Sequence, residues 1–210
     1  TGVATGVPSR RKVVKLTYFG GAHSLIASPY GLPPGRTAAN GRREVPGVQA
    51  VAVTDEPWKG DACSLVEAYR AGERSPREEM EATLAAIGTS DLNCFSFVDA
   101  DAALAAAAAA DVSLPFGGVP AGVKELDHVA GWPDTAASLV FKDRIGKETS
   151  TSVQRLRDKG GAALVGLTNA SEFGGLNVSV NLLHGVTHNP WERGKSAGGS
   201  SGGSASAVAG

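Results

Sequence analysis

The chain has 210 residues and a formal net charge of −1, and 42% of its residues are hydrophobic. This size and composition allow one substantial globular domain or two small ones, with an ordinary apolar core. The near-zero charge argues against direct binding to nucleic acid or to an anionic membrane. No apolar run reaches the roughly 18 residues that a membrane-spanning helix needs, so we expect neither partner.

Residues 1–58 differ in character from the rest of the chain. They are rich in Pro and Gly, carry a surplus of Lys and Arg, and show neither helical nor strand periodicity. Such a segment buries too little apolar surface to offset its ordering entropy. We therefore predict a largely disordered N-terminal extension over 1–58 and a folded domain over 59–210.

Residues 9–15, Ser-Arg-Arg-Lys-Val-Val-Lys, resemble a twin-arginine export signal. The stretch that follows is only modestly apolar, because Gly20, Gly21 and His23 interrupt it. A cytoplasmic location is therefore the main expectation, with twin-arginine export as the alternative.

Regular structure is expected from residue 61. Apolar side chains recur at helical spacing over 61–72 and 75–88, and the second segment begins with Ser-Pro-Arg-Glu, which is typical of a capping box. Residues 93–98 alternate as a strand does. An alanine-rich helix, capped by Asp99, then extends to about residue 110.

The second half of the chain alternates strands and helices. Residues 118–124 predict a loop that leads into a buried strand, and 151–159 a helix with apolar and charged sides. Residues 162–166 form a continuous apolar run, as in a strand covered on both faces. Residues 177–195 are polar and irregular. This alternation indicates the α/β class.

Lys124 is the first candidate for chemistry. It ends the apolar, Gly- and Pro-rich run Gly-Gly-Val-Pro-Ala-Gly-Val, whereas most lysines lie in solvent. Apolar surroundings lower the pKa of a lysine, which can then accept a proton near neutral pH. The alternative is an ordinary exposed lysine.

Ser200 and Ser201 form the second candidate, since they stand between two Gly-Gly pairs. The simplest interpretation is a flexible Gly/Ser linker. Gly-x-Ser-x-Gly around Ser200 also matches a nucleophile elbow, but no apolar strand precedes it. Residues 194–196, Gly-Lys-Ser, end like a Walker A motif, although Asn189 stands where that motif needs Gly.

Taken in chain order, these segments resemble the amidase signature family. The resemblance extends from about Leu65 to Gly210. The matching segments are Asn-Cys-Phe at 93–95, Gly-Val-Pro-Ala-Gly-Val-Lys at 118–124, Val-Gly-Leu-Thr-Asn at 165–169, Gly-Val-Thr-His-Asn-Pro-Trp at 185–191 and the Ser-rich loop after residue 195. The resemblance implies a mixed sheet flanked by helices, and amide hydrolysis through a Ser–Ser–Lys triad without metal or cofactor.

The resemblance also implies roles for individual residues. Lys124 is expected to be the terminal base and Ser200 the bridging serine, preceded by a cis Gly199–Ser200 peptide bond, while Ser201 supports the loop by hydrogen bonding. In the family, the attacking serine and the oxyanion hole belong to a further Gly-Gly-Ser segment. Beyond the Ser-rich loop and the small-residue run 202–209, no further Gly-Gly-Ser segment occurs by Gly210. We therefore expect a domain truncated before its nucleophile and inert by itself.

Three functions remain open at this point. The first is an amidase that cleaves the C–N bond of a small-molecule carboxamide through an acyl-enzyme. The second is the glutamine-using subunit of a glutamine-dependent Glu/Asp-tRNA amidotransferase, which shares the motifs and requires a partner protein. The third, from another class, is an inactive fragment or non-catalytic binding module. A homodimer is left open as an assembly.

The remaining reactive side chains receive structural interpretations. Cys63 and Cys94 are too few for a disulfide framework, so we expect two buried free thiols in a reducing compartment. His128, His184 and His188 are expected to be loop or core histidines rather than metal ligands or members of a Ser-His-Asp triad. Serines 204 and 206 are expected to begin a helix, which makes them poor nucleophiles. Glutamate at 125, where many relatives carry Asp, is expected to matter little.

Overall fold

A computed structural model describes residues 56–210 of the chain. The twin-arginine-like segment, and all but the last few residues of the predicted disordered extension, lie outside this range. The domain division after residue 58 therefore stays a prediction. Within 56–210, the longest apolar helices are still too short or too polar to cross a membrane.

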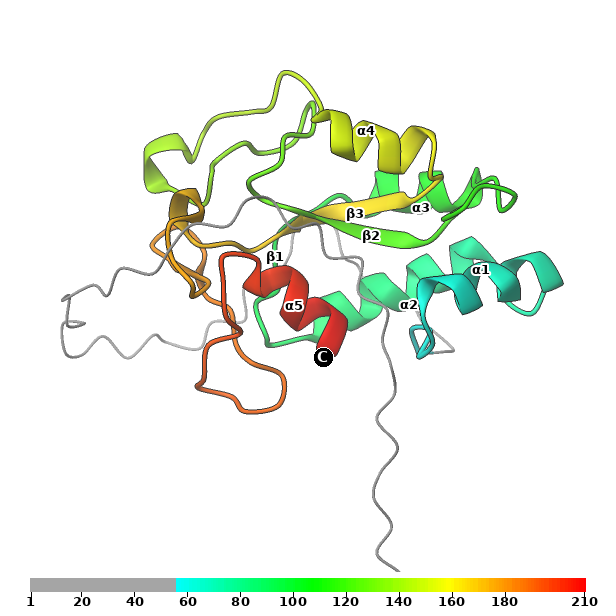
Figure 1. Cartoon of the computed structure of the whole chain (residues 1–210), viewed down its shortest axis with the longest axis horizontal. Coiled ribbons are helices and arrows are strands. Elements are labelled where there is room, and N and C mark those ends of the chain that lie inside the picture. Colours follow the sequence, from blue (N-terminus) through cyan, green and yellow to red (C-terminus); the bar gives the residue numbers. More distant parts are fainter. Residues whose placement is uncertain (1–55) are drawn as a thin grey trace, which may run out of the picture.

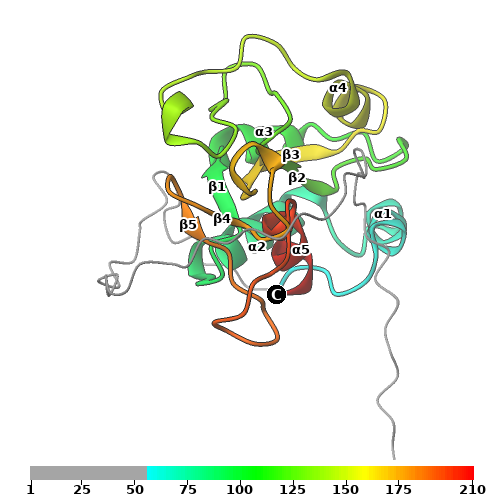
Figure 2. The same ribbon diagram turned by 60° about the vertical axis from the view of Figure 1, so that its left-hand side comes forward.

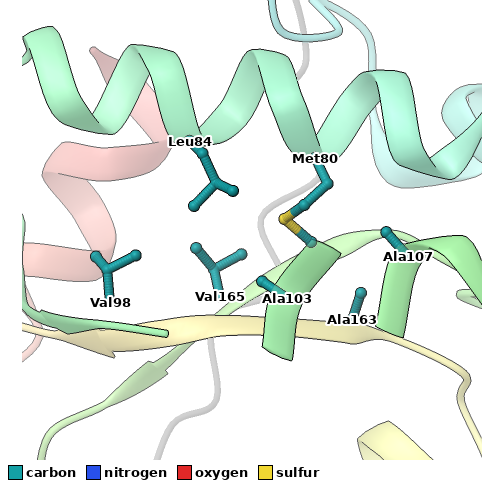
Figure 3. Packing of buried hydrophobic residues seen from close by; sticks show 7 residues of the cluster. All are labelled: Met80, Leu84, Val98, Ala103, Ala107, Ala163 and Val165. Atoms are coloured by element: carbon teal, nitrogen blue, oxygen red, sulfur yellow. The ribbon is translucent and has the colours of Figure 1, made fainter. Parts of the chain in front are cut away.

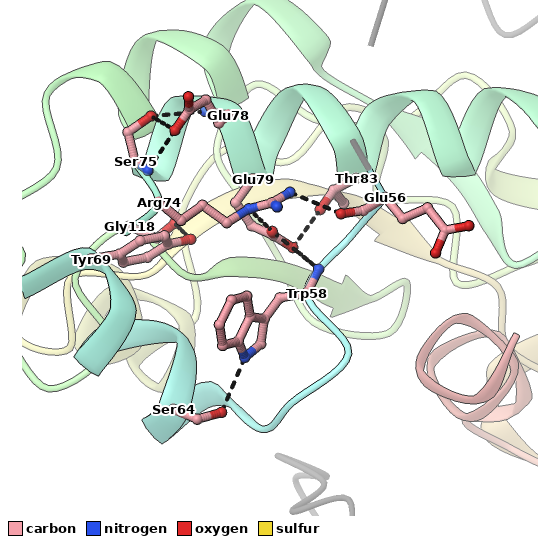
Figure 4. Close-up of polar contacts among 10 residues, drawn as sticks. All are labelled: Glu56, Trp58, Ser64, Tyr69, Arg74, Ser75, Glu78, Glu79, Thr83 and Gly118. Atoms are coloured by element: carbon pink, nitrogen blue, oxygen red, sulfur yellow. Dashed lines mark hydrogen bonds and ion pairs between the residues drawn. The ribbon is translucent and has the colours of Figure 1, made fainter. Parts of the chain in front are cut away.

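The first two helices begin and end where local sequence signals place them. Helix α1 (Ala62–Ala71) is capped by Asp61 and ends at Gly72, whose φ of 73° suits glycine. Helix α2 (Pro76–Thr89) carries the expected capping box, in which Ser75 and the third helical residue bond to each other's backbone N–H groups (Figure 4).

A buried ion pair links the start of α2 to the N-terminal end of the described chain (Figure 4). The guanidinium Nε of Arg74 lies 2.7 Å from Glu79 Oε2, and these side chains are only 8% and 5% exposed. The backbone N–H of Trp58 also donates to Glu79, at 3.0 Å. Sequence periodicity missed this pair because it counts apolar side chains only, and Glu79 lies on the buried side of α2 beside Met80.

The expected mixed sheet is present. It has the strand order β1-β3-β2, with β2 parallel and β1 antiparallel to the central strand β3. The strands are β1 (Phe95–Val98), β2 (Pro120–Lys124) and β3 (Ala163–Thr168). Every residue of β3 is buried, as the continuous apolar run predicts.

Helices cover both faces of this sheet (Figures 1 and 2). On one face α2 and α3 (Ala100–Ala108) enclose a core of seven buried residues, shown in Figure 3: Met80, Leu84, Val98, Ala103, Ala107, Ala163 and Val165. On the other face α4 (Thr151–Asp158) contributes Val153 to a second core with Leu164, Leu167 and Trp132. Ala163, Leu164 and Val165 thus alternate between the two cores, as strand geometry requires.

The last part of the chain is built from short elements. The polar segment 177–195 contains a small antiparallel hairpin, which its irregular sequence does not predict. The elements are the 3₁₀ turns η1 (Leu139–Phe141) and η2 (Glu172–Gly174), the strands β4 (Val180–Asn181) and β5 (Gly185–Val186), and the helix α5 (Gly202–Ala209). Helix α5 begins directly after the paired serines, as expected.

One prediction about the cysteines is wrong. Both thiols are free, but only Cys94 is buried, whereas Cys63 is exposed. Leu65, Val66 and Tyr69 form the buried side of α1, and Cys63 lies on the opposite side. Burial raises the pKa of the Cys94 thiol.

We expect Leu84→Ala to lower the free energy of unfolding by about 2–5 kcal/mol, because it leaves a cavity between α2 and the sheet. Equilibrium urea unfolding measures the change. The matched control is Leu182→Ala, at a leucine that is 84% exposed, where we expect a change within about 0.5 kcal/mol. Equal losses at the two positions would contradict the assigned core.

Candidate active site

The site begins where two parallel strands end side by side. The register of β2 and β3 pairs Lys124 with Thr168. The next backbone N–H, that of Glu125, donates to Thr168 O at 3.1 Å and extends the pairing by one step. Since parallel strands present their carboxyl ends at the same edge of a sheet, this register brings Lys124 to the edge where ligands of α/β proteins commonly bind.

The Ser-rich loop lies against this edge in direct backbone contact. Gly203 N donates to Asn169 O at 3.0 Å, and a Cβ at Gly203 would come within 2.3 Å of Asn169 N. At the next glycine, Gly202 N donates to Ser179 Oγ at 2.8 Å, and a Cβ there would come within 2.4 Å of that oxygen. The second Gly-Gly pair therefore lets the start of α5 approach the strand ends more closely than any side chain allows.

The two residues singled out from the sequence meet in this arrangement. Lys124 Nζ lies 2.7 Å from Ser200 Oγ, within hydrogen-bond distance. The peptide bond between Gly199 and Ser200 is cis, as the family resemblance implied. The Ser200 carbonyl accepts a hydrogen bond from Ser171 N at 3.2 Å, which ties the loop to the segment after β3.

The sequence analysis missed a pair of hydrogen-bonded hydroxyl groups close to Lys124, those of Thr168 and Ser204. Thr168 Oγ1 and Ser204 Oγ lie 2.6 Å apart, and Thr168 Oγ1 also bonds to Val123 O at 3.3 Å. Ser204 lies in α5, so the expectation that it begins a helix is confirmed. Thr168 neighbours Lys124 only because of the register between β2 and β3. Local sequence patterns do not predict that register.

Burial shapes the acid–base properties of the lysine. Lys124 is partly buried, and this desolvation lowers the pKa of its amine, while the negative charge of Asp127 acts in the opposite direction. Burial likewise raises the pKa of the Asp127 carboxyl, and Lys124 opposes that change. The site therefore holds a lysine with an increased tendency to be neutral.

Ser201 occupies the N-cap position of α5, but its side chain forms no capping hydrogen bond. Its carbonyl accepts from Ala205 N at 3.1 Å. A supporting role through the Ser201 hydroxyl stays a prediction.

The described structure does not favour the alternative motifs. Within residues 187–199 only an isolated bridge between His188 and Ser196 is present, so no strand leads into Ser200 as an elbow requires. Between residues 56 and 210 no group of three His, Cys, Asp or Glu side chains could hold a metal ion. His128 instead pairs with Asp134 at 2.8 Å.

Sequence reasoning gave Glu125 little weight, and the structure places it at the centre of a polar cluster. The side chain is 1% exposed, accepts a hydrogen bond from the hydroxyl of Thr135 and shares one, at 2.7 Å, with Nε2 of His184. The lysine at 124 thus precedes a buried carboxylate whose partners come from two other segments.

A sequence profile described as Amidase matches residues 78–210. The chain therefore belongs to the amidase signature family. Its fold, a mixed sheet between helices, is that of solved members of this family.

Among curated relatives, the chain is 40% identical over 139 residues to a glutamyl-tRNA(Gln) amidotransferase subunit of Methylacidiphilum infernorum. It is 38% identical over 157 residues to the protein of the same name from Acidothermus cellulolyticus. The matches cover 65% and 70% of this chain but only 28% and 31% of those relatives. The chain thus spans less than a third of their length.

Solved structures of similar fold include a 6-aminohexanoate cyclic dimer hydrolase, with a TM-score of 0.66 and 33% identity over 71% of this chain and 31% of that one. A peptide amidase from Stenotrophomonas maltophilia gives a TM-score of 0.65 and 30% identity, covering 72% of this chain and 34% of its own.

We expect Gly203→Ala to displace the start of α5 from the strand ends, because the added Cβ has no space against Asn169. The apparent Tm measured by circular dichroism should fall by several degrees, as a loss of about 1–3 kcal/mol implies. Gly175→Ala is the matched control, since its φ is −77° and its Cβ would meet nothing closer than 3.6 Å. A Gly203→Ala protein as stable as the control would contradict the close packing.

Competitive labelling of amines across a pH series should show Lys124 half-reacted at a lower pH than a free lysine derivative added as the internal standard, because burial lowers its pKa. Peptide mass spectrometry resolves each lysine. Coincidence of the Lys124 curve with the standard would show that the amine is fully solvated.

Proposed function

We propose that this chain supplies the lysine and bridging serine of an amidase that hydrolyses a carboxamide C–N bond through a Ser–Ser–Lys triad. The observation that carries the proposal is the 2.7 Å contact between Lys124 Nζ and Ser200 Oγ. A proton relay requires hydrogen-bond distances between its members, and this contact meets that requirement. Membership of a family of amide hydrolases supports the same reaction class.

In the proposed reaction, a serine hydroxyl attacks the amide carbonyl carbon. Ser200 takes the proton of that hydroxyl while passing its own to neutral Lys124. When the tetrahedral intermediate collapses, the C–N bond breaks and the proton returns through Ser200 to the leaving nitrogen. Water then attacks the acyl-enzyme and gives its proton to the same relay. As the acyl C–O bond breaks, the relay returns that proton to the serine oxygen and the carboxylic acid leaves.

The attacking serine is proposed to come from the Gly-Gly-Ser segment that follows the Ser–Ser loop in the family, along with the backbone N–H groups that stabilise the oxyanion. Ser200 is already engaged by Lys124, and Ser204 by Thr168. These two hydroxyls are therefore assigned to relay and support rather than to attack.

The second candidate is the glutamine-using subunit of an amidotransferase that acts on tRNA-linked glutamate or aspartate. It is favoured by one observation, the 38–40% identity to curated relatives that carry this name. Such a protein would hydrolyse glutamine and deliver ammonia to a partner protein. A stand-alone amidase would instead turn over simple amides without a partner. For either candidate, we expect a cytoplasmic location.

The test uses the longest natural form of the protein that contains these residues. We expect Lys124→Met and Ser200→Ala each to lower kcat for amide hydrolysis by at least about a thousandfold, because each breaks the relay. Lys195→Met is the matched control, since the Lys195 side chain is 67% exposed. Full activity in Lys124→Met would exclude the proposed base.

Two further measurements separate the candidates. Glutamine hydrolysis that appears only with a partner protein would favour the amidotransferase, and turnover of simple amides by the protein alone would favour the amidase. The 210-residue chain itself should not react with a fluorophosphonate probe. Strong labelling that disappears in Ser200→Ala would instead make Ser200 the attacking residue.

A further inference from the structure

The Glu125 side chain is a buried carboxyl group that the proposed reaction does not use. It follows Lys124 directly and is 1% exposed. Its Oε1 forms hydrogen bonds with His184 Nε2 and with the Thr135 hydroxyl. Its Oε2 is buried and finds no hydrogen-bond partner within residues 56–210. The Glu125 carboxyl group and the His184 ring thus share one hydrogen bond.

Two side chains form hydrogen bonds with the backbone of His184. His184 lies between β4 and β5, and its backbone N–H donates to Asn181 Oδ1 at 2.6 Å. Its carbonyl accepts from Asn93 Nδ2 at 2.9 Å. The imidazole therefore extends from a backbone that is tied both to its own hairpin and to the segment before β1.

The same hairpin segment supports the loop that carries Ser200. Ser179 accepts a hydrogen bond from Gly202 N through its side chain and one from Thr187 N through its carbonyl. At the other end of the loop, a Cβ on Gly199 would come within 2.6 Å of Val178 N. Residues 178–187 thus contact the serine loop on one side and present His184 to Glu125 on the other.

We propose that Glu125 and His184 form a positioning pair that sets the separation between the strand carrying Lys124 and the segment supporting the Ser200 loop. The inference rests on the proposed function, because only a proton relay demands a constant distance between Lys124 and Ser200. A hydrogen bond between buried side chains contributes only modest net stability, because both groups lose their water on folding. Its directionality can nevertheless fix how two segments lie relative to each other.

The test compares two substitutions of similar size at one position. His184→Leu removes the donor to Glu125, and His184→Gln keeps a side-chain N–H that can reach the carboxylate. Competitive amine labelling across a pH series reports how well Lys124 is held in its partly buried position. In His184→Leu, we expect the labelling curve of Lys124 to move to higher pH, toward the curve of a free lysine standard. In His184→Gln, we expect the Lys124 curve to stay close to the curve of the unmodified protein.

The buried ion pair of Arg74 and Glu79 provides the control for general loosening of the fold. Glu79→Gln disturbs this pair, which lies at the start of α2. We expect it to lower the apparent Tm while leaving the Lys124 labelling curve unchanged. If His184→Leu does not fold, Thr135→Val removes the other donor to Glu125, and we expect it to move the curve in the same direction.

Two outcomes would overturn the proposal: an unchanged Lys124 curve in a folded variant that lacks a donor to Glu125, or an equal displacement in Glu79→Gln. Labelling requires no turnover, so its result is independent of amidase activity. A protein that hydrolyses no amide yet shows the displacement would reject the catalytic assignment of Lys124 and retain the effect of the pair on its position.

Discussion

The parallel pairing of β2 with β3 is the constraint on which the site depends. It places Lys124 opposite Thr168 at the end of the sheet and leaves Glu125 bonded to the same partner strand. Neighbouring residues along an extended chain point in opposite directions. Lys124 can therefore face Ser200 while Glu125 reaches the cluster that contains His184.

The position of the serine loop also depends on the two glycines at the start of α5, Gly202 and Gly203. A helix that approaches a strand end closely enough for a backbone hydrogen bond leaves no room for a Cβ, as the contact of Gly203 with Asn169 shows. Glycine weakens a helix when considered alone. Here the hydrogen bonds from Gly202 to Ser179 and from Gly203 to Asn169 offset that weakness and anchor the serine loop.

Apart from the Arg74–Glu79 pair at the start of α2, many of the buried polar side chains gather around these strand ends. Several of them bond to the backbone of irregular segments, where no regular ladder satisfies the carbonyl groups. Asn169 donates to Asn93 O, Asn181 to Ala170 O and Thr187 to Asn93 O, each at about 3 Å. The apolar cores thus provide rigidity, and this polar layer gives the loops one defined arrangement.

Local chemistry in the sequence determined the capping box before α2, the Asp99 cap of α3 and the fully buried strand β3, because each depends on residues a few positions apart. Lys124 and Ser200 could be named as candidates, but their 2.7 Å contact joins positions 76 residues apart. The pairs Glu125–His184 and Thr168–Ser204 span 59 and 36 residues. Only the tertiary structure decided these contacts, since strand register and helix approach depend on packing across the whole domain, which no local pattern encodes.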